Sequence, residues 1–127
     1  MLHALLVQPG RTPKEVSIKN SLKTLQNAVG GTITAIYPFE DDVAIIANDD
    51  GKLSGLPLNR SLRLPDGKIY DIIAGDFLVV GLSKDNFSSL TAELQKKYTE
   101  YFYCPEIYLM KENEIISIPV YTDRGDE

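Results

Sequence analysis

The segment IYDIIAGDFLVVG, residues 69–81, constrains the fold more than any other because it is the most strand-like run in the sequence. Branched and aromatic apolar residues of this kind favour an extended strand. Gly75 interrupts the run, and a glycine inside a strand commonly marks a bulge or a close approach of two backbones. Asp76, directly after it, is an acidic residue in apolar surroundings. The segment predicts a sheet with an irregularity at this point.

Four shorter segments predict further strands in antiparallel pairs. Residues 2–9 form an apolar run and residues 14–20 alternate between apolar and polar, so a hairpin through Pro9-Gly10-Arg11 is expected. Alternation resumes over residues 32–39, and residues 43–48 form a compact apolar run that is typical of a buried strand. We expect these two segments to pair, which makes the sheet mainly antiparallel.

Glycine-marked turns frame the segment GLPLNR, residues 55–60. Gly51 in NDDGK and Gly67 after Pro65-Asp66 each stand at a turn position that needs a positive φ. GLPLNR lies between these turns, and we expect it to be a loop.

Two segments have the spacing of amphipathic helices. The first begins at an N-cap, Asn20 or Ser21, and stops at Gly30-Gly31. The second covers residues 86–102 and ends at Cys104-Pro105. Its apolar stripe consists of Phe87, Leu90, Leu94, Tyr98 and Tyr101. The sequence therefore predicts one short and one long helix.

The order of these elements predicts an α+β fold in a single domain, residues 1–127. The order is strand, strand, helix, strand, strand, loop, strand, long helix, strand, strand. The last two strands form a terminal hairpin over about residues 106–121, and the charged tail, residues 122–127, is expected to fray. The first half has the order of elements seen in β-grasp, ubiquitin-like domains.

Composition and charge limit the classes of function. The 127 residues have the usual size of one domain, and no apolar run approaches the roughly 20 residues that span a bilayer. A net charge of −5 disfavours direct binding of nucleic acid, because the protein repels the phosphates. The single cysteine, Cys104, and an N-terminus without a basic segment before its apolar run indicate a cytoplasmic protein with no membrane role.

No motif in the sequence identifies a reaction. Neither a P-loop nor a dinucleotide-binding fingerprint is present. A serine or cysteine nucleophile would have to recruit the only histidine, His3. The acidic clusters Glu40-Asp41-Asp42 and Asp49-Asp50 lack the spacing of a calcium loop and fit solvated turns. We therefore expect no catalytic residue, no metal site and no cofactor.

The segment GLPLNR is the first candidate for a binding site. Gly55 permits an unusual backbone conformation and Pro57 fixes one backbone torsion. Asn59 and Arg60 bring an amide and a cation with five donors to the same short loop. Such a loop has the donors to grip a carboxylate or a phosphate.

Asp76 supplies the second half of this hypothesis. A carboxylate inside an apolar strand is costly to bury unless it is paired, and Arg60 carries a rigid donor fork. We predict that Arg60 and Asp76 lie on the same side of the sheet and that Arg60 holds the GLPLNR loop against IAGDF, residues 73–77. In the structural alternative, Asn59 caps the following turn and Arg60 pairs with an acid such as Asp71 or Asp76.

Aromatic residues gather at the end of the second helix, in YTEYFY. We expect Tyr98, Tyr101 and Phe102 to pack on the sheet, and Tyr103 to reach the surface, where it would serve a partner interface. The candidate binding residues are therefore Gly55, Leu56, Pro57, Asn59, Arg60, Gly75, Asp76 and Tyr103.

Four segments of the sequence together resemble a known family: ALLVQPG, GGTITAIYPFEDDVAIIANDDGK, GLPLNRSLR and YDIIAGDFLVVGL. The chain is similar, over roughly residues 2–103, to a small bacterial and phage family catalogued as a domain of unknown function. The resemblance implies a setting among accessory proteins of plasmids, conjugative elements and phages, often near antirestriction and mobilisation genes. It implies no activity, cofactor or catalytic residue.

Three functions stay open from the sequence. The first is a non-enzymatic accessory factor that binds another protein, such as a host defence or regulatory component. The second is a binder of small molecules or nucleotide derivatives, or a weak enzyme, using Asn59 and Arg60 with Asp76 nearby. The third is a ubiquitin-like interaction module, in which an exposed edge strand near residues 16–18 or 32–37 accepts a strand from a partner.

Overall fold

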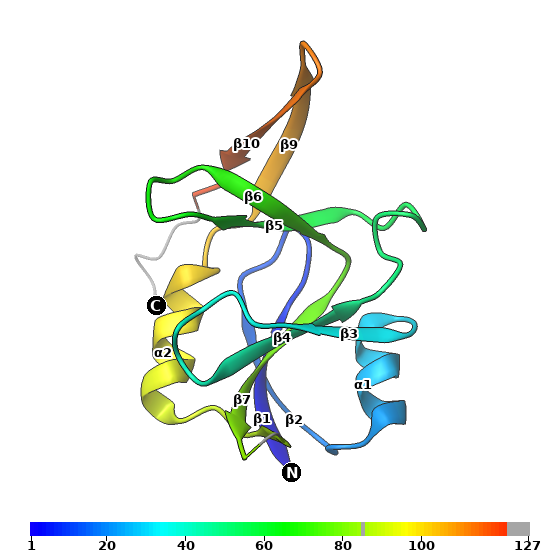
Figure 1. The fold of residues 1–127 in the computed structure, drawn as a ribbon, viewed down its shortest axis with the longest axis vertical. Helices are drawn as coiled ribbons and strands as arrows, with labels where there is room; N and C mark the ends of the chain where they lie inside the picture. The colour runs from blue at the N-terminus through cyan, green and yellow to red at the C-terminus, as the bar shows by residue number, and fades with distance from the viewer. Residues whose placement is uncertain (85, 122–127) are drawn as a thin grey trace.

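The computed structural model describes residues 1–84 and 86–121, which contain ten strands and two helices (Figure 1). In chain order these are β1 (Leu2–Val7), β2 (Lys14–Ile18), α1 (Leu22–Val29), β3 (Ile33–Ile36), β4 (Val43–Asn48), β5 (Leu58–Arg63), β6 (Ile69–Ala74), β7 (Phe77–Ser83), β8 (Asn86–Ser88), α2 (Ala92–Tyr101), β9 (Glu106–Lys111) and β10 (Glu114–Pro119). The predicted α+β fold with mainly antiparallel sheets is confirmed. The tail expected to fray, residues 122–127, lies outside the described residues.

Strand β7 is the centre of the main sheet. The strand order is β2-β1-β7-β4-β3, β8 pairs with β7, and all of these pairs are antiparallel. Val79 of β7 lies between Leu5 of β1 and Ile45 of β4. Both expected strand pairs, β1–β2 and β3–β4, are present. The first half of the chain does not form this sheet by itself, because β7 from the second half lies between its two strand pairs.

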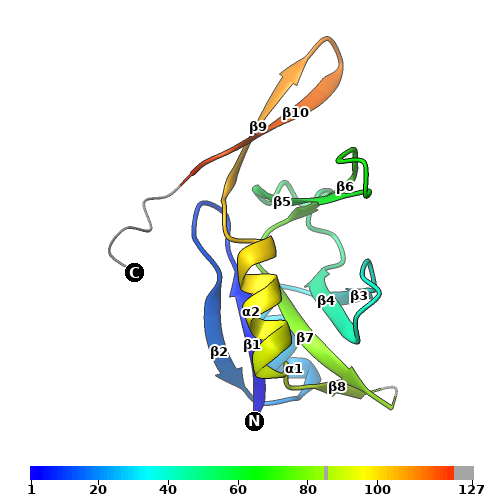
Figure 2. The same ribbon diagram turned by 90° about the vertical axis from the view of Figure 1, so that its left-hand side faces the viewer.

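The main sheet has a core on each face because successive side chains of a strand point to opposite sides. From β7, Phe77 and Val79 pack in the core that contains residues of α2, whereas Leu78 and Val80 pack in the core that contains residues of α1. Figure 2 shows α2 in front of the sheet and α1 behind it. The two helices therefore cover opposite faces.

Helix α1 has the ends that its sequence predicts. Ser21 is the N-cap, and its hydroxyl accepts a hydrogen bond from the backbone N–H of Thr24 at 3.3 Å. Gly30 ends the helix in the left-handed conformation, with φ of 77°. Among residues 1–84 and 86–121, no helix has both the length and the apolar character needed to cross a membrane.

Helix α2 is shorter than predicted. It begins after the N-cap Thr91 and spans 10 residues, so the expected start at residue 86 is wrong. Phe87 instead lies in β8, opposite Leu82 of β7. Pairing with the sheet satisfies the backbone of this segment and overrides its helical spacing.

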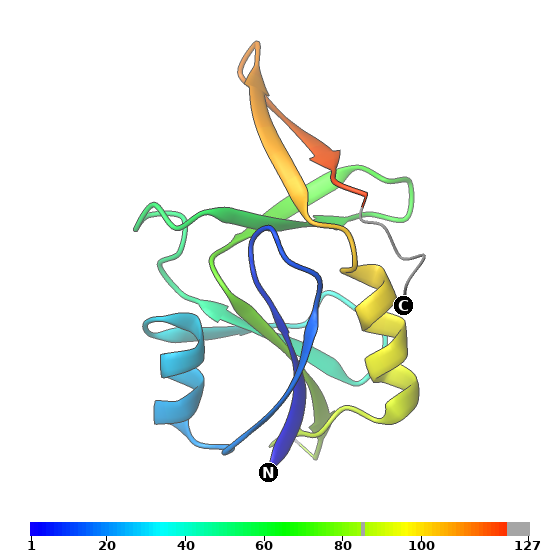
Figure 3. The ribbon, with the colours of Figure 1, turned by 180° about the vertical axis from the view of Figure 1, so that it is seen from behind.

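The segment GLPLNR contributes to a strand, although the sequence predicts a loop. Strand β5 pairs with β6 in a second, two-stranded sheet near the C-terminal hairpin (Figures 1 and 3). The pairing register shifts between Leu58 and Arg60, which makes Asn59 the extra residue of a β-bulge. Since a bulge breaks the alternation from which strands are recognised, the sequence does not reveal β5.

The expected irregularity at Gly75 is a turn between two sheets. Gly75 has φ of 80° and connects β6 to β7, which belong to different sheets. Gly67 has the expected positive φ of 91°, whereas Gly51 does not have a positive φ. Gly51 is needed for a different reason, because a Cβ there would lie 2.8 Å from the carbonyl oxygen of Ala74.

Candidate functional site

Asn59 and Arg60, the polar residues predicted to bind a ligand, are buried in the structure with 1% exposure each. The Asn59 amide nitrogen donates hydrogen bonds to the carbonyl oxygens of Val7 at 2.9 Å and Gly75 at 2.8 Å. These bonds tie the bulge of β5 to the end of β1 and to the turn before β7. The amide of Asn59 therefore joins the two sheets.

Arg60 donates to acceptors from three parts of the chain. Its Nε bonds the carbonyl of Phe102 at 3.0 Å, and Nη2 bonds the carbonyl of Arg11 at 2.5 Å. Its Nη1 bonds the backbone oxygen of Asn59 at 3.2 Å and the side-chain oxygen at 2.8 Å. Burial lowers the pKa of the Arg60 guanidinium, and the negative charge of Glu106 opposes that shift. Arg60 thus fastens the end of α2 and the β1–β2 turn to β5.

The predicted ion pair between Arg60 and Asp76 does not form. Asp76 accepts a hydrogen bond from the side chain of Gln8 at 3.1 Å, and Asp71 pairs with Lys52 at 2.5 Å. The guanidinium points into the interior, where backbone carbonyls satisfy it. The alternative ion pair of Arg60 with Asp71 is also wrong, because Asp71 pairs with Lys52 and the guanidinium donates to oxygens of Arg11, Asn59 and Phe102. The capping role of Asn59 is wrong because Asn59 lies inside a strand.

The segments GLPLNR and IAGDF nevertheless lie together, as predicted. The N–H of Gly75 donates to the carbonyl of Pro57 at 2.7 Å, and a Cβ at Gly75 would lie 2.7 Å from Cδ1 of Leu56. Gly55, with φ of 73°, and Pro57 are exposed beside this junction. Asn59, and not Arg60 as predicted, connects the two segments through its hydrogen bond to the carbonyl of Gly75.

Tyr98 and Phe102 at the end of α2 are buried in the core, as predicted, but the positions of Tyr101 and Tyr103 are the reverse of the prediction. Tyr103 is buried with 7% exposure, whereas Tyr101 is 46% exposed. The helix ends at Tyr101, and the C-cap Phe102 has φ of −99°, so helical spacing no longer sets the direction of the next side chains. Tyr101 is therefore the aromatic residue of this group that is available at the surface.

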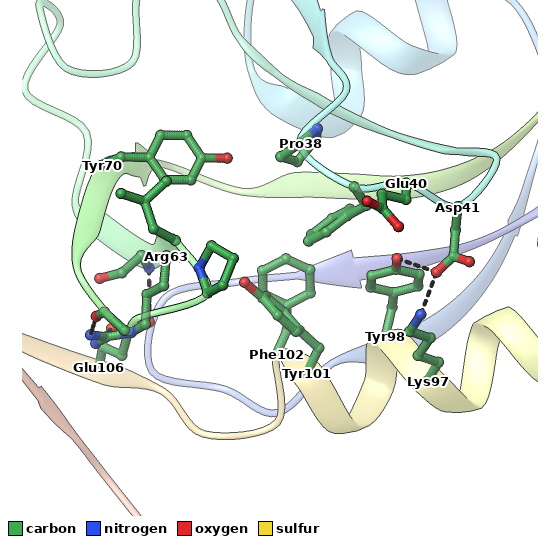
Figure 4. Close-up of a pocket in the computed structure, with 15 residues that line it drawn as sticks. Pro38, Glu40, Asp41, Arg63, Tyr70, Lys97, Tyr98, Tyr101, Phe102 and Glu106 are labelled. Atoms are coloured by element: carbon green, nitrogen blue, oxygen red, sulfur yellow. Dashed lines mark hydrogen bonds and ion pairs between the residues drawn. The ribbon is translucent and has the colours of Figure 1, made fainter.

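An open cleft lies where the loop 38–41, the β5–β6 sheet and the end of α2 meet (Figure 4). Its volume is about 710 Å³. Tyr70 enters it from β6 and Tyr101 from α2, and they are 48% and 46% exposed. Phe39, Tyr98 and Phe102 complete its aromatic lining. We call this the aromatic cleft.

Four rings of the aromatic cleft pack against one another, those of Phe39, Tyr98, Tyr101 and Phe102. Tyr101 packs edge-on against Phe102, with centroids 4.7 Å apart, and against Phe39 at 5.2 Å. Phe39 also packs at 4.6 Å against the buried ring of Tyr98. These contacts restrain the exposed Tyr101, and a restrained aromatic surface loses little entropy when a ligand binds.

Asp41 is paired at one end of the aromatic cleft. Its Oδ2 accepts hydrogen bonds from Nζ of Lys97 at 2.6 Å and from the hydroxyl of Tyr98 at 2.7 Å. The bond from Lys97 and then that from Tyr98 lower the pKa of the Asp41 carboxyl. Burial and the same bond to Asp41 raise the pKa of Tyr98.

Glu106 is paired at the other end. It accepts hydrogen bonds from the backbone N–H of Ser61 at 2.8 Å and from the hydroxyl of Ser117, and it forms an ion pair with Arg63 at 3.3 Å. Burial alone would raise the pKa of Glu106, but the hydrogen bonds from the two serines, with Arg63, hold it below its usual value. This carboxylate connects β9 and β10 to β5.

Glu40 is the third carboxylate of the aromatic cleft. It is exposed, and its side chain forms no hydrogen bond or ion pair with any residue in the described ranges. Figure 4 places it at the same end as Asp41. The acidic turn was interpreted from the sequence as merely solvated, so Glu40, Phe39 and Tyr70 were missed. No local pattern in the sequence connects Tyr70 with the turn at Glu40, because the two are brought together only by the fold.

Catalytic geometry is not assembled around His3. The hydroxyl of Ser17 lies 2.7 Å from Nδ1 of His3 because the two residues are opposite each other in β1 and β2. Within the described residues no side chain bonds Nε2 of His3, so a third group that would orient the imidazole is missing. The same residues contain no group of three or more His, Cys, Asp and Glu side chains placed to hold a metal.

The family model described as a domain of unknown function (DUF3846) matches residues 2–103. The chain belongs to this family. The DUF3846 region includes the main sheet, both helices and most of the aromatic cleft, whereas Glu106 and the β9–β10 hairpin lie beyond the matched residues. No curated protein and no solved structure matches the chain.

Proposed function

We propose that this DUF3846 protein is a non-enzymatic protein-binding factor whose aromatic cleft takes an extended peptide segment of its partner. A basic side chain of that segment would lie close to Glu40. The observation that carries the proposal is the pair of exposed tyrosines, Tyr70 and Tyr101, in an open cleft that also contains a carboxylate without a partner among the described residues.

The aromatic lining supports a peptide ligand. Tyrosine is enriched in protein interfaces because its ring offers a large contact area and its hydroxyl tolerates water. Tyr70 and Tyr101 present these features on different elements, β6 and α2, so a segment lying across the cleft contacts both. The packing of Tyr101 against Phe39 and Phe102 holds one of these contacts in place.

The charge of the site supports a basic ligand. Lys97 and Arg63 are engaged by Asp41 and Glu106, which leaves Glu40 as the carboxylate able to receive a new cation. The net charge of −5 attracts a basic partner to the whole molecule. A cation above an exposed tyrosine ring adds about 0.5–1 kcal/mol.

A small-molecule ligand is the second candidate function. The volume of about 710 Å³ falls within the range of ligand pockets. The alternative based on Asn59 and Arg60 loses its support, because their donors are buried and used within the chain. A small ligand would have to use the aromatic cleft instead.

The setting of the binding event is also part of the proposal. We propose a cytoplasmic protein of mobile-element type that acts on a host defence or regulatory component. The family resemblance and the single cysteine support this setting. The alternative of a ubiquitin-like module needs an edge strand that can pair with a strand of a partner. Among the described strands, β2 and β3 are the edges of the main sheet, so strand addition stays a proposal.

Peptide selection tests the proposed function. Peptides selected from a random display library on the wild-type protein should be rich in arginine or lysine beside apolar residues. Tyr101→Ala should weaken their binding at least tenfold and Glu40→Gln several-fold. Tyr37→Ala is the matched control, because Tyr37 is 62% exposed and does not line the aromatic cleft.

Equal binding by the wild type, Tyr101→Ala and Glu40→Gln would contradict the proposed site. Failure to select any peptide, together with saturable binding of a small metabolite that Tyr101→Ala removes, would assign the cleft to the second candidate function.

A further inference from the structure

The β9–β10 hairpin carries an unusual share of the exposed apolar surface. Of fifteen large apolar residues exposed in the described ranges, eight lie between Ile107 and Tyr121. The hairpin projects from the body of the molecule in all three ribbon views (Figures 1, 2 and 3). Concentrated exposed apolar surface marks a site of association.

The hairpin has one face directed to β5 and one directed away. Tyr108 lies opposite Ser117 in the register, and both belong to the inner face with Glu106. The alternate positions form the outer face, in which each residue of β9 lies directly opposite one of β10. Its pairs are Ile107 with Ile118, Leu109 with Ile116, and Lys111 with Glu114.

Polar contacts fix this orientation. Glu106 accepts a hydrogen bond from the N–H of Ser61 at 2.8 Å, and the hydroxyl of Tyr108 lies 3.0 Å from that of Ser61. Glu106, Tyr108 and Ser117 thus hold the inner face toward the body near the base of the hairpin, while Met110 and Ile115 of the same face are exposed nearer its tip. The outer face, with its four aliphatic side chains, is directed away from the body. The usual pattern of a sheet packed on a core is the reverse.

No described part of the chain covers the outer face. Ile107, Leu109, Ile116 and Ile118 are 53%, 51%, 39% and 42% exposed. An aliphatic sheet face that is exposed in this way marks a contact surface for another molecule.

We infer that this surface contacts the outer face of a second copy of the chain, in a two-fold symmetric dimer. A two-fold axis along the hairpin places β9 of one copy over β10 of the other. Leu109 then meets Ile116 of the second copy, and Ile107 meets Ile118. Lys111 meets Glu114 of the second copy, so the charges at the hairpin tip are complementary as well.

The size of the hairpin predicts a weak dimer. A standard interface uses about 20–30 residues on each side. Strands β9 and β10 have six residues each, of which alternate positions belong to the outer face. We therefore expect a dissociation constant in the micromolar range and an oligomeric state that changes with concentration.

Sedimentation velocity across the micromolar range tests the inference. The wild type should convert from monomer to dimer without larger species. Leu109→Glu and Ile116→Glu should each raise the dissociation constant at least tenfold. Met110→Glu is the matched control on the same hairpin, because Met110 is 70% exposed but belongs to the inner-face register.

Exchange of the tip charges gives an independent test of the pairing. Lys111→Glu should weaken the dimer by opposing two carboxylates, and Lys111→Glu combined with Glu114→Lys should restore it. Circular dichroism should be unchanged in these variants, since all the substituted side chains are exposed. A monomer at every concentration, growth beyond a dimer, or a dimer insensitive to Leu109→Glu would overturn the inference.

Discussion

The side-chain oxygen of Asn59 accepts a hydrogen bond from Nη1 of Arg60 at 2.8 Å, although the two residues are neighbours in one strand. Neighbouring side chains of a regular strand point to opposite faces. The bulge at Asn59 removes that constraint and allows both side chains to enter the interior. The buried amide and guanidinium then join β5 to β1, to Gly75 and to the end of α2.

Arg60 is expected to be essential for stability. Arg60→Met leaves the buried carbonyl of Phe102 and the partly buried carbonyl of Arg11 without this donor, and should lower the free energy of unfolding by about 3–5 kcal/mol. Arg60→Lys should recover only part of this loss, because an ammonium cannot reproduce the planar fork. Urea denaturation measures both variants, and a loss below about 1 kcal/mol in Arg60→Met would contradict the assigned role.

Gly75 is expected to be less replaceable than Gly55. Both have positive φ, which costs about 1–2 kcal/mol for alanine. At Gly55 a Cβ meets nothing within 4 Å, whereas at Gly75 it would lie 2.7 Å from Leu56. Gly75→Ala should therefore destabilise the protein by about 0.5–1.5 kcal/mol more than Gly55→Ala, because the flexible side chain of Leu56 has to leave its present rotamer. Equal melting temperatures for the two variants would show that Leu56 moves freely.

Glu106 should make stability depend on pH. Its pKa is lower in the folded than in the unfolded protein, so its stabilisation is complete above its usual pKa of 4.5 and is lost as the pH falls through the folded value. Glu106→Gln should lower the free energy of unfolding by about 1–3 kcal/mol at pH 7, and the variant should lose less stability than the wild type as the pH is lowered. Denaturation at several pH values measures this. An equal loss of stability at acid pH in both proteins would show that Glu106 does not cause it.

The bonds to Asp41 should be visible in its titration. Lys97 contributes most to the lowered pKa of Asp41 and Tyr98 contributes next. Lys97→Met should therefore raise the pKa of Asp41 toward its usual value by more than Tyr98→Phe does. NMR titration of the Asp41 carboxyl carbon provides the measurement. The reverse order would show that the Tyr98 hydroxyl is the main partner.

The sequence predicts those elements whose pattern is local. Ser21 and Gly30 mark both ends of α1. Apolar runs predict β1 and β4 and alternation predicts β2 and β3, because capping and pleating depend on residues close in the chain. The terminal hairpin is equally local, with its turn between Lys111 and Glu114.

Features that depend on distant contacts were missed. Strand β5 is hidden because its bulge places consecutive polar residues in the interior, where carbonyls from β1 and α2 satisfy them. The aromatic cleft combines the loop at Glu40, strand β6 at Tyr70 and helix α2 at Tyr101. No local pattern connects these three residues, and the direction of Tyr101 depends on where α2 ends.

The most direct test of the proposed binding role is an NMR titration of the protein with an arginine-containing peptide, with observation of the tyrosine ring signals. If the peptide binds in the aromatic cleft, the ring signals of Tyr70 and Tyr101 should shift until the protein is saturated, and the shifts should be smaller in Glu40→Gln. The ring signals of Tyr37, which lies outside the cleft, should not shift. A titration with the same peptide in which arginine is replaced by glutamate should give no saturable shift. Equal shifts of Tyr37, Tyr70 and Tyr101, or saturation by the glutamate peptide, would contradict a cleft that recognises a basic segment.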